Sequence, residues 1–424
     1  DATRKLHGRK AEVLDAFVFG GVDVGTARVS GRLGRHTVLW GESLFFGSNA
    51  IASTQAPVDV IKASSVPGST TKEILRPVGQ LSGQVQVSSD LTLMGYYQYE
   101  WEKTRLPAAG SYFSAGDFFD AGGERLRTAP GVPGNGFLRA PDIDAKDSGQ
   151  FGLGLRTHLG EFDLGAYATR YHAKAPAVYV RPGPTGVGGA AAGRYQLVYA
   201  EGIKAFGLSA TTSVGAVNYG AEISVRRGTP LISPPQTVIG PALADNNDYP
   251  LYAIGNSFHA NVSMIWTLPR LGLLDEASLV MEVAYNQLTS CTRNCTPTAA
   301  GAFRAKGALD PGADRRAVAV RATFAAPQRN MLDGLDLTPS ISASYNDGKS
   351  PVQTLGPDGG GDVTLALAGN YLTVWNFSLS YTHYYGKENT SLYASTIPAV
   401  NNTFTFGQTL KDRNFVSLSV QRSF

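Results

Sequence analysis

Residues 362–385 read DVTLALAGNYLTVWNFSLSYTHYY, and this stretch decides the fold. Successive side chains of a β-strand point to opposite faces of the sheet, so alternate residues share a face. One face here is apolar and aromatic, carrying Val363, Leu365, Leu367, Gly369, Tyr371, Trp375, Phe377, Leu379, Tyr381 and Tyr385. The other face is mostly polar, which predicts a β-hairpin. A soluble sandwich shows the same alternation, but strand length, aromatic placement and repetition favour a transmembrane antiparallel β-barrel.

The composition agrees with one all-β barrel domain over residues 1–424. The chain contains 49 Gly, 19 Phe and 19 Tyr, whereas only 17% of its residues are charged. No apolar run approaches the roughly 20 residues that a membrane helix needs. The net charge of +3 is too small to indicate nucleic-acid binding. The chain starts at Asp1 without a signal-peptide pattern, so we expect any export signal to be removed or missing.

About fifteen segments show this alternation. They are 13–20, 26–40, 77–89, 91–101, 149–158, 162–172, 203–214, 219–226, 256–268, 276–288, 315–325, 335–347, 362–371, 375–385 and 412–424. Their connections alternate between short turns and long loops, as in outer-membrane barrels, where the long loops lie outside the cell. Residues 195–199 are assigned to a long loop, because another full strand there would reverse this alternation. Residues 103–148 form another long loop.

The strand count has a consequence for closure of the barrel. Bacterial single-chain barrels have an even number of strands, and the last strand is expected to end on the periplasmic side. Fifteen strands therefore predict at least one more strand upstream of Asp1 and 16–18 strands in the intact barrel. Pairing of residues 12–20 with the last strand would contradict this expectation.

Residues 41–76 form a long loop that is rich in Gly, Pro and apolar residues. Outside the cell it would expose Leu44, Phe45, Phe46, Ile51 and Ile61 to water, whereas folding into the lumen would hide them and narrow the pore. The constriction would then hold Glu42, Phe45, Phe46, Asp59, Lys62, Lys72, Glu73 and Arg76. The alternative is a surface loop with ordinary ion pairs.

Charged residues also occur on the polar, lumen-facing side of the strands. They are Arg28, Arg32, Glu100, Glu102, Arg156, His158, Glu222, Arg226, Glu282 and Arg321. In a water-filled pore such a mixed set would create a transverse field that orients polar solutes. The alternative is that these charges solvate the lumen and pair with one another.

Two further features concern assembly and the loops. The chain ends on Phe424, which follows Val416, Leu418 and Val420 on one strand face and resembles the signal read by the outer-membrane assembly machinery. Cys291 and Cys295 lie close together in the sequence, and an oxidising cell-surface compartment favours a local disulfide between them. No further ligands with suitable spacing for a zinc site lie nearby, so no metal is expected.

Two long runs resemble a proteobacterial family of porin-like outer-membrane proteins of unknown function. They are GRHTVLWGESLFFGSNAIASTQAPVDVIKASSVPGSTTKEILRPVGQLSG at 34–83 and YYQYEWEKTRLPAAGSYFSAGDFF at 96–119. WGES, PVD, KEILRP and SYFS are the specific parts. The resemblance implies a monomeric barrel whose pore is partly occupied by inward loops. Family genes often lie beside genes for lipid or hydrophobe transport, which implies envelope transport partners, and members carry sequence before the part matching 14–17.

The leading hypothesis is therefore an integral protein of the bacterial outer membrane that forms a diffusion channel for small amphipathic or hydrophobic molecules. A general or anion-preferring porin is one alternative, and a plugged barrel acting in surface interaction or envelope assembly is another. Expected partners are outer-membrane lipid or lipopolysaccharide, the assembly machinery and a small solute. A barrel lipid hydrolase is disfavoured, because His383 is the one candidate base and lacks a Ser and an orienting carboxylate on its face. We expect no enzyme activity and no cofactor.

Overall fold

The computed structural model describes most of the chain. The described residues are 3–8, 11–65, 71–116, 118–119, 121–126, 136–185, 191–239, 243–270, 272, 276–296, 304–305, 309–389, 392–393, 403–404 and 406–423. The helices are short and comprise η1 (Arg4–Gly8), η2 (Ile51–Thr54), α1 (Val60–Ser65) and α2 (Thr71–Ile74). None of the helices in these residues has the length and apolar character of a membrane span.

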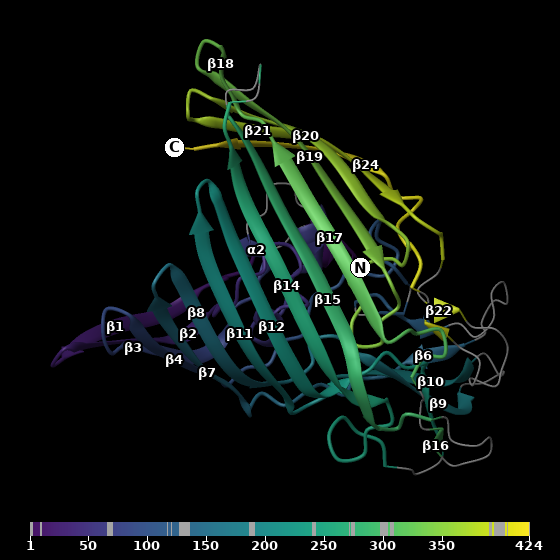
Figure 1. Cartoon of the computed structure of the whole chain (residues 1–424). Helices are drawn as coiled ribbons and strands as arrows, with labels where there is room; N and C mark the ends of the chain where they lie inside the picture. Colours follow the sequence, from purple (N-terminus) through teal and green to yellow (C-terminus); the bar gives the residue numbers. More distant parts are fainter. Residues whose placement is uncertain are drawn as a thin grey trace.

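One large antiparallel sheet of sixteen strands dominates the described part of the molecule (Figure 1). Its strands are β1 (Ala16–Val24), β2 (Ala27–His36), β3 (Val78–Gln86), β4 (Leu91–Gln98), β7 (Gln150–Leu159), β8 (Phe162–Tyr171), β11 (Ile203–Val214), β12 (Val217–Pro230), β14 (Ile254–Leu268), β15 (Ala277–Arg293), β17 (Arg316–Ala325), β18 (Gln328–Leu332), β19 (Leu335–Asp347), β20 (Gly361–Tyr371), β21 (Trp375–Tyr385) and β24 (Phe415–Arg422). Neighbours in the sheet follow chain order, and β18 pairs with β19 beside the main path. The expected antiparallel transmembrane sheet of about fifteen strands is confirmed.

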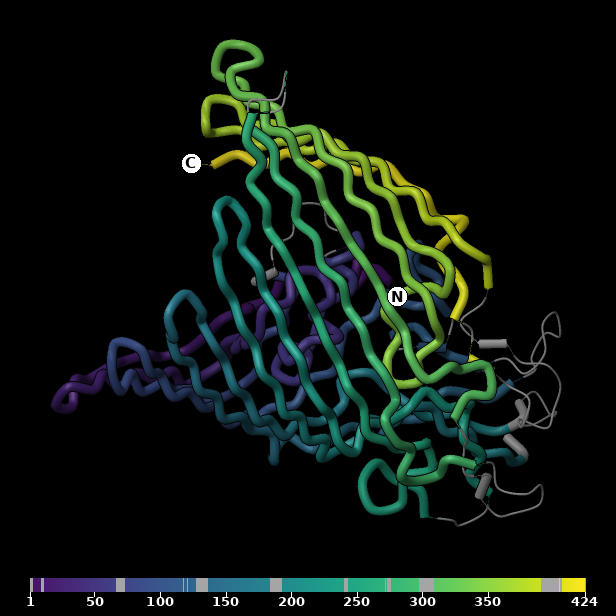
Figure 2. Tube along the Cα trace, in the orientation of Figure 1, coloured from purple at the N-terminus to yellow at the C-terminus, as the bar shows by residue number. Residues whose placement is uncertain are grey.

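The sheet curves strongly, and β1 and β24 form its two edges (Figure 2). Among the described residues β1 pairs with β2 alone and β24 with β21 alone. The pairing that would contradict an additional strand is therefore absent from this part of the chain. The additional strand itself stays a prediction.

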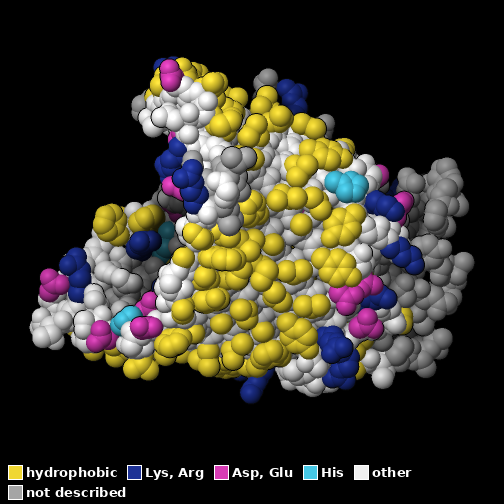
Figure 3. All heavy atoms as spheres, turned by 45° about the horizontal axis from the view of Figure 1, so that its top comes forward, with side chains coloured by type: hydrophobic (Ala, Val, Ile, Leu, Met, Phe, Trp, Pro, Cys, Tyr) yellow, Lys and Arg dark blue, Asp and Glu magenta, His cyan; other side chains and the backbone are white. Residues whose placement is uncertain are grey.

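The two faces of the sheet differ as the alternation predicts. Leu153, Val262, Leu365 and Val416 are between 53% and 67% exposed on the outer, convex face. Hydrophobic side chains, drawn in yellow, gather over a broad area of this face (Figure 3). At the short-turn end, the Arg422 guanidinium lies 5.3 Å from the centre of the Trp375 ring. An apolar band with aromatic residues at its margins is typical of an outer-membrane sheet surrounded by lipid.

The long connections fold into a second, mixed sheet that the sequence analysis did not predict. It contains β5 (Arg125–Leu126), β6 (Phe137–Arg139), β9 (Ala177–Thr185), β10 (Ala191–Val198), β13 (Gln236–Val238) and β16 (Arg304–Ala305). A third, two-stranded sheet joins β22 (Leu392–Tyr393) and β23 (Thr403–Phe404). Most of residues 195–199 lie in β10, so they belong to a long connection and not to the main sheet, as predicted, but they form a strand of the second sheet there.

The side chains of the long connections form an apolar core inside the curve of the main sheet. Trp40 and Ile51 pack there with Tyr96, Tyr167 and Tyr252, all at most 6% exposed. The Trp40 ring lies 5.0 Å from Tyr96 and 5.6 Å from Tyr167 between centroids. The concave side of strands β4 to β14 is consequently packed with protein where these loops lie.

Candidate functional site: the loop on the lumen wall

The chain turns inward directly after Trp40, and residues 42–51 lie against the concave face of the main sheet. Gly41 makes this turn with a φ of +99°, and a Cβ there would lie 2.1 Å from the Glu222 carboxylate. A side chain at this position would therefore be strained and would collide with the sheet. The loop thus begins at a position that requires glycine.

The Glu282 carboxylate of β15 is the first anchor of the loop. It is fully buried and accepts hydrogen bonds from the Leu44 amide at 3.1 Å, the Phe46 amide at 3.0 Å and the Phe45 amide between them. The Ser43 hydroxyl donates to its other oxygen at 2.8 Å. Successive backbone amides that converge on one anion form a nest, and hydrogen bonds to a charged acceptor are stronger than neutral ones. This single side chain therefore fixes residues 43–46 on the sheet.

Strand β12 provides the second anchor through two residues that face the lumen. The Glu222 carboxylate accepts hydrogen bonds from the amides of Glu42, at 3.0 Å, and Ile51. The Arg226 guanidinium donates to the carbonyl oxygens of Asn49 at 2.6 Å and Ala50 at 3.0 Å. The acidic side chain of β12 thus binds two amides of the loop, and the basic side chain binds two of its carbonyls.

Asn49 sits at the centre of a buried amide cluster. Its amide donates to Asn261 Oδ1 at 2.9 Å and to the Tyr285 carbonyl at 3.0 Å. Its own oxygen accepts from Asn286 Nδ2 at 3.2 Å and from the His259 Nδ1 at 2.9 Å. The side chain of Asn49 is therefore satisfied by β14 and β15 together, as a buried polar group must be.

Two apolar side chains of the loop remain exposed. Leu44 is 44% and Phe45 is 36% exposed, whereas Phe46 is buried against Ala284 and Ala319. Phe45 also lies beneath β17, with the Arg321 guanidinium 5.8 Å from its ring centre. The anchored segment therefore leaves part of the apolar surface of Leu44 and Phe45 uncovered.

Ion pairs hold two further positions of the loop, Asp59 and Arg76. The Asp59 carboxylate, 2% exposed, lies 2.6 Å from Arg105, and Arg76 lies 3.0 Å from Glu102. Glu100 lies 2.9 Å from Arg35. Asp59 and Arg76 are thus tied to residues 105 and 102, whereas the Glu100–Arg35 pair joins residues outside the loop.

The remaining predicted residues are distributed as follows. Glu42 lies 3.6 Å from Arg156, and Lys62 donates to the Glu73 carbonyl at 3.4 Å. Arg321 pairs with Asp362 at 3.0 Å. Arg28, 4.0 Å from Asp23, and Arg32, 5.4 Å from the centre of the Phe17 ring, lie near the β1 edge, away from the anchors. The side chain of Lys72 and all of Phe424 lie outside the described residues.

Three of the lumen charges are bound by the loop. Glu222, Arg226 and Glu282 are at most 4% exposed, so they do not stand free in a water-filled pore. These three side chains bind the loop because its backbone amides and carbonyls are buried there and need hydrogen-bond partners in place of water. At these three positions the charge is therefore hydrogen-bonded to the loop and does not act on a solute in the pore.

Lys174, which the sequence analysis missed, lies beneath the same loop. Its ammonium group donates to the Thr54 carbonyl at 3.2 Å and lies 5.3 Å from the centre of the Tyr171 ring. Burial, together with the nearby Arg226 charge, lowers the pKa of Lys174 to about 7. Burial raises the pKa of Glu42, against the opposing influence of Arg156. No sequence motif marks Lys174, because its enclosure depends on the loop fold.

Cys291 and Cys295 form a disulfide. Cys291 belongs to the end of β15, which runs farther than the expected 276–288, and Cys295 follows the strand. The bond therefore closes a small ring where β15 enters its long connection.

Comparison with known proteins identifies the family. The model of the family described as "Protein of unknown function (DUF1302)" matches residues 1–424. The chain belongs to this family. Its curved antiparallel sheet and apolar outer face are those of an integral, porin-like protein of the bacterial outer membrane. No curated protein matches the chain.

Solved structures of outer-membrane proteins resemble the fold at low identity. OccAB3 of Acinetobacter baumannii has a TM-score of 0.41 and 11% identity, over 96% of this chain and 77% of that one. OmpT of Vibrio cholerae has a TM-score of 0.37 and 9% identity, over 87% and 80%. OmpF of Salmonella typhi, solved with daunomycin, has a TM-score of 0.34 and 10% identity, over 95% and 99%.

Proposed function

We propose that this protein is an outer-membrane diffusion channel for small amphipathic or hydrophobic molecules, with residues 41–76 as the constriction. The observation that carries the proposal is the anchoring of residues 43–46 on the Glu282 carboxylate. A loop held by one buried anion keeps its shape while a solute passes. Its exposed Leu44 and Phe45 would give an apolar surface to the path.

An apolar lining favours apolar solutes over ions. A solute that covers ~50 Å² of apolar surface on these side chains gains about 1.3 kcal/mol, or roughly tenfold in affinity. A hydrated ion gains nothing from the same contact and must shed water to pass. The proposal contains no catalytic step and no cofactor.

The test uses single-channel recording in planar bilayers with indole as the solute. We expect small conductance steps that indole blocks, and a roughly tenfold weaker block in the Leu44→Ser/Phe45→Ser variant. Leu159→Ser, which changes an exposed leucine at a short turn, is the matched control and should behave as wild type. Large steps that indole leaves unchanged would support a general or anion-preferring porin instead.

A second candidate is favoured by the mixed sheet of the long connections. Strands from four separate connections form this sheet, and Tyr179, Tyr195 and Leu197 in it are fully buried. So much ordered structure on the loop side would suit a plugged barrel that binds an envelope partner. Complete absence of conductance steps from correctly folded protein would favour this candidate over the channel.

A further inference from the structure

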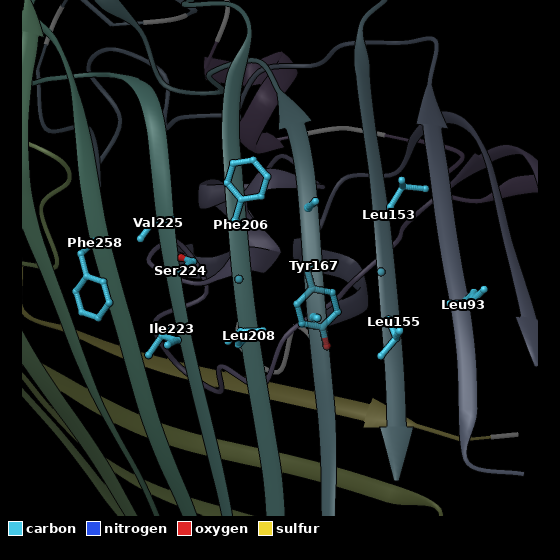
Figure 4. A pocket seen from close by; sticks show the side chains of 14 residues that line it. Leu93, Leu153, Leu155, Tyr167, Phe206, Leu208, Ile223, Ser224, Val225 and Phe258 are labelled. Atoms are coloured by element: carbon cyan, nitrogen blue, oxygen red, sulfur yellow. The ribbon is translucent and has the colours of Figure 1, made fainter. Parts of the chain in front are cut away.

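A groove runs along β8 on the outer face of the sheet. Ala166 and Ala168 form its floor, because in register they lie between the larger side chains of β7 and β11. Its walls are Leu153, Leu155, Phe206 and Leu208, and its volume is about 610 Å³ (Figure 4). The small floor residues leave a hollow of a kind that a flexible hydrocarbon chain fills.

Three basic residues stand in a row at one end of this groove. Lys204 pairs in register with Arg170 of β8 on one side and with Arg227 of β12 on the other. Residues paired in register share a face, and each of the three lies two positions beyond a groove-face residue, so the row is on the outer face. Two strand spacings separate the outer members of the row, a width of about 10 Å.

The positive charges of Arg170, Lys204 and Arg227 have no carboxylate partner among the described residues. Arg170 donates to the Gly149 carbonyl at 2.7 Å, and the Arg227 guanidinium lies 6.0 Å from the centre of the Phe206 ring. Within the described part of the chain, no carboxylate lies within ion-pairing distance of the three, and the nearby Glu201 is paired with Lys146 at 3.0 Å. Like charges placed opposite one another destabilise a sheet, so an anion bound to this row would relieve that repulsion.

The position of the row indicates which membrane leaflet it meets. Arg170 precedes the long connection after β8, Lys204 follows it, and Arg227 precedes the one after β12. Long connections lie on the extracellular side of outer-membrane barrels. The outer leaflet there consists of glycolipid that carries both phosphates and acyl chains. A second copy of this chain would bring another row of three cations against the first.

We propose that this groove and the Arg170–Lys204–Arg227 row bind one lipopolysaccharide molecule through its lipid A part. An acyl chain lies along the Ala166–Ala168 floor, and a phosphate contacts the basic row. The site rests on the outer-membrane placement of the sheet and is independent of the channel proposal. A lipid bound at this site would lie on the outer face of the same strands that contact the loop on their inner face.

The test titrates detergent-purified wild-type protein with diphosphoryl lipid A and measures bound lipid by native mass spectrometry. Each cation near an anionic surface is worth about a fivefold change in affinity, so Lys204→Gln/Arg227→Gln should bind roughly 25-fold more weakly. Arg316→Gln/Lys411→Gln removes two exposed cations away from the groove and should bind as wild type. Ala168→Phe fills the floor, keeps the charge and should also weaken binding.

Four outcomes would overturn the proposal. Three of them are equal binding by wild type and Lys204→Gln/Arg227→Gln, equal binding by wild type and Ala168→Phe, and displacement of the lipid by inorganic phosphate at the lipid's own concentration. The last would show an anion site without a lipid groove. Dimers that exclude lipid A would show that a second copy occupies the face and would equally contradict the site. Unchanged circular dichroism verifies that each variant is folded.

Discussion

Glu282→Gln should release residues 43–46 from the inner wall of the sheet. The wild-type carboxylate accepts three successive loop amides, the Ser43 hydroxyl and the Asn261 amide at 2.7 Å. A glutamine has nearly the same shape, but it loses the charge and turns an NH₂ group toward donors. Breaking a buried charged network of this kind costs roughly 3 kcal/mol. The cost falls on loop docking, because every one of these loop donors lies within residues 43–46.

Hydrogen–deuterium exchange of detergent-purified protein measures this docking directly. A loss of roughly 3 kcal/mol raises the fraction of open loop about 100-fold, so the amides of residues 44–46 should exchange about 100-fold faster. Glu276→Gln is the matched control, since Glu276 precedes the same strand and pairs on the surface with Arg329 at 2.9 Å. An exposed pair is worth at most about 1 kcal/mol. Equal exchange at 44–46 in both variants would refute the anchoring argument.

The remaining predictions concern charge and covalent links. The pKa of Lys174 is about 7 in the folded protein and 10.5 as its ordinary value, so the unfolded chain binds the proton more tightly. The contribution of Lys174 to the free energy of unfolding is therefore lowest below pH 7 and rises as the pH approaches 10.5. Lys174→Met should flatten this rise in pH-dependent thermal unfolding. Asp59→Asn removes the 2.6 Å pair with Arg105, which keeps Glu12 at 2.8 Å, and should therefore cost about 2 kcal/mol, seen as faster proteolysis within 41–76. Reduction of Cys291–Cys295 should cost at most about 2 kcal/mol, since the ring is small, and should lower the melting temperature only slightly.

The main sheet could be predicted from the sequence because its signal is local and repeated. Every strand of the main path carries the two-residue alternation, so errors at single positions do not alter the assignment. Boundaries were less accurate where loops extend the pairing, as at the end of β15, where residues 289–293 continue the ladder with β14. The lipid supplies a uniform apolar environment, which makes the outer face easy to read.

The site could be predicted only in outline. The apolar content of residues 41–76 indicated that the loop folds inward, but nothing in the sequence pairs Ser43 with Glu282 or Asn49 with His259. Such contacts join residues more than 200 positions apart and depend on how the sheet curves. The mixed sheet was missed for a similar reason, because its short strands come from four connections and show no long alternation.

We propose that the loop after Trp40, anchored on the inner wall at residues 42–51, sets the width of the path. Single-channel conductance of wild type and of a variant lacking residues 43–47 tests it most directly. If the loop is the constriction, the shortened variant should conduct several-fold more than wild type while Glu276→Gln does not. Equal conductance of the shortened variant and wild type would contradict the claim.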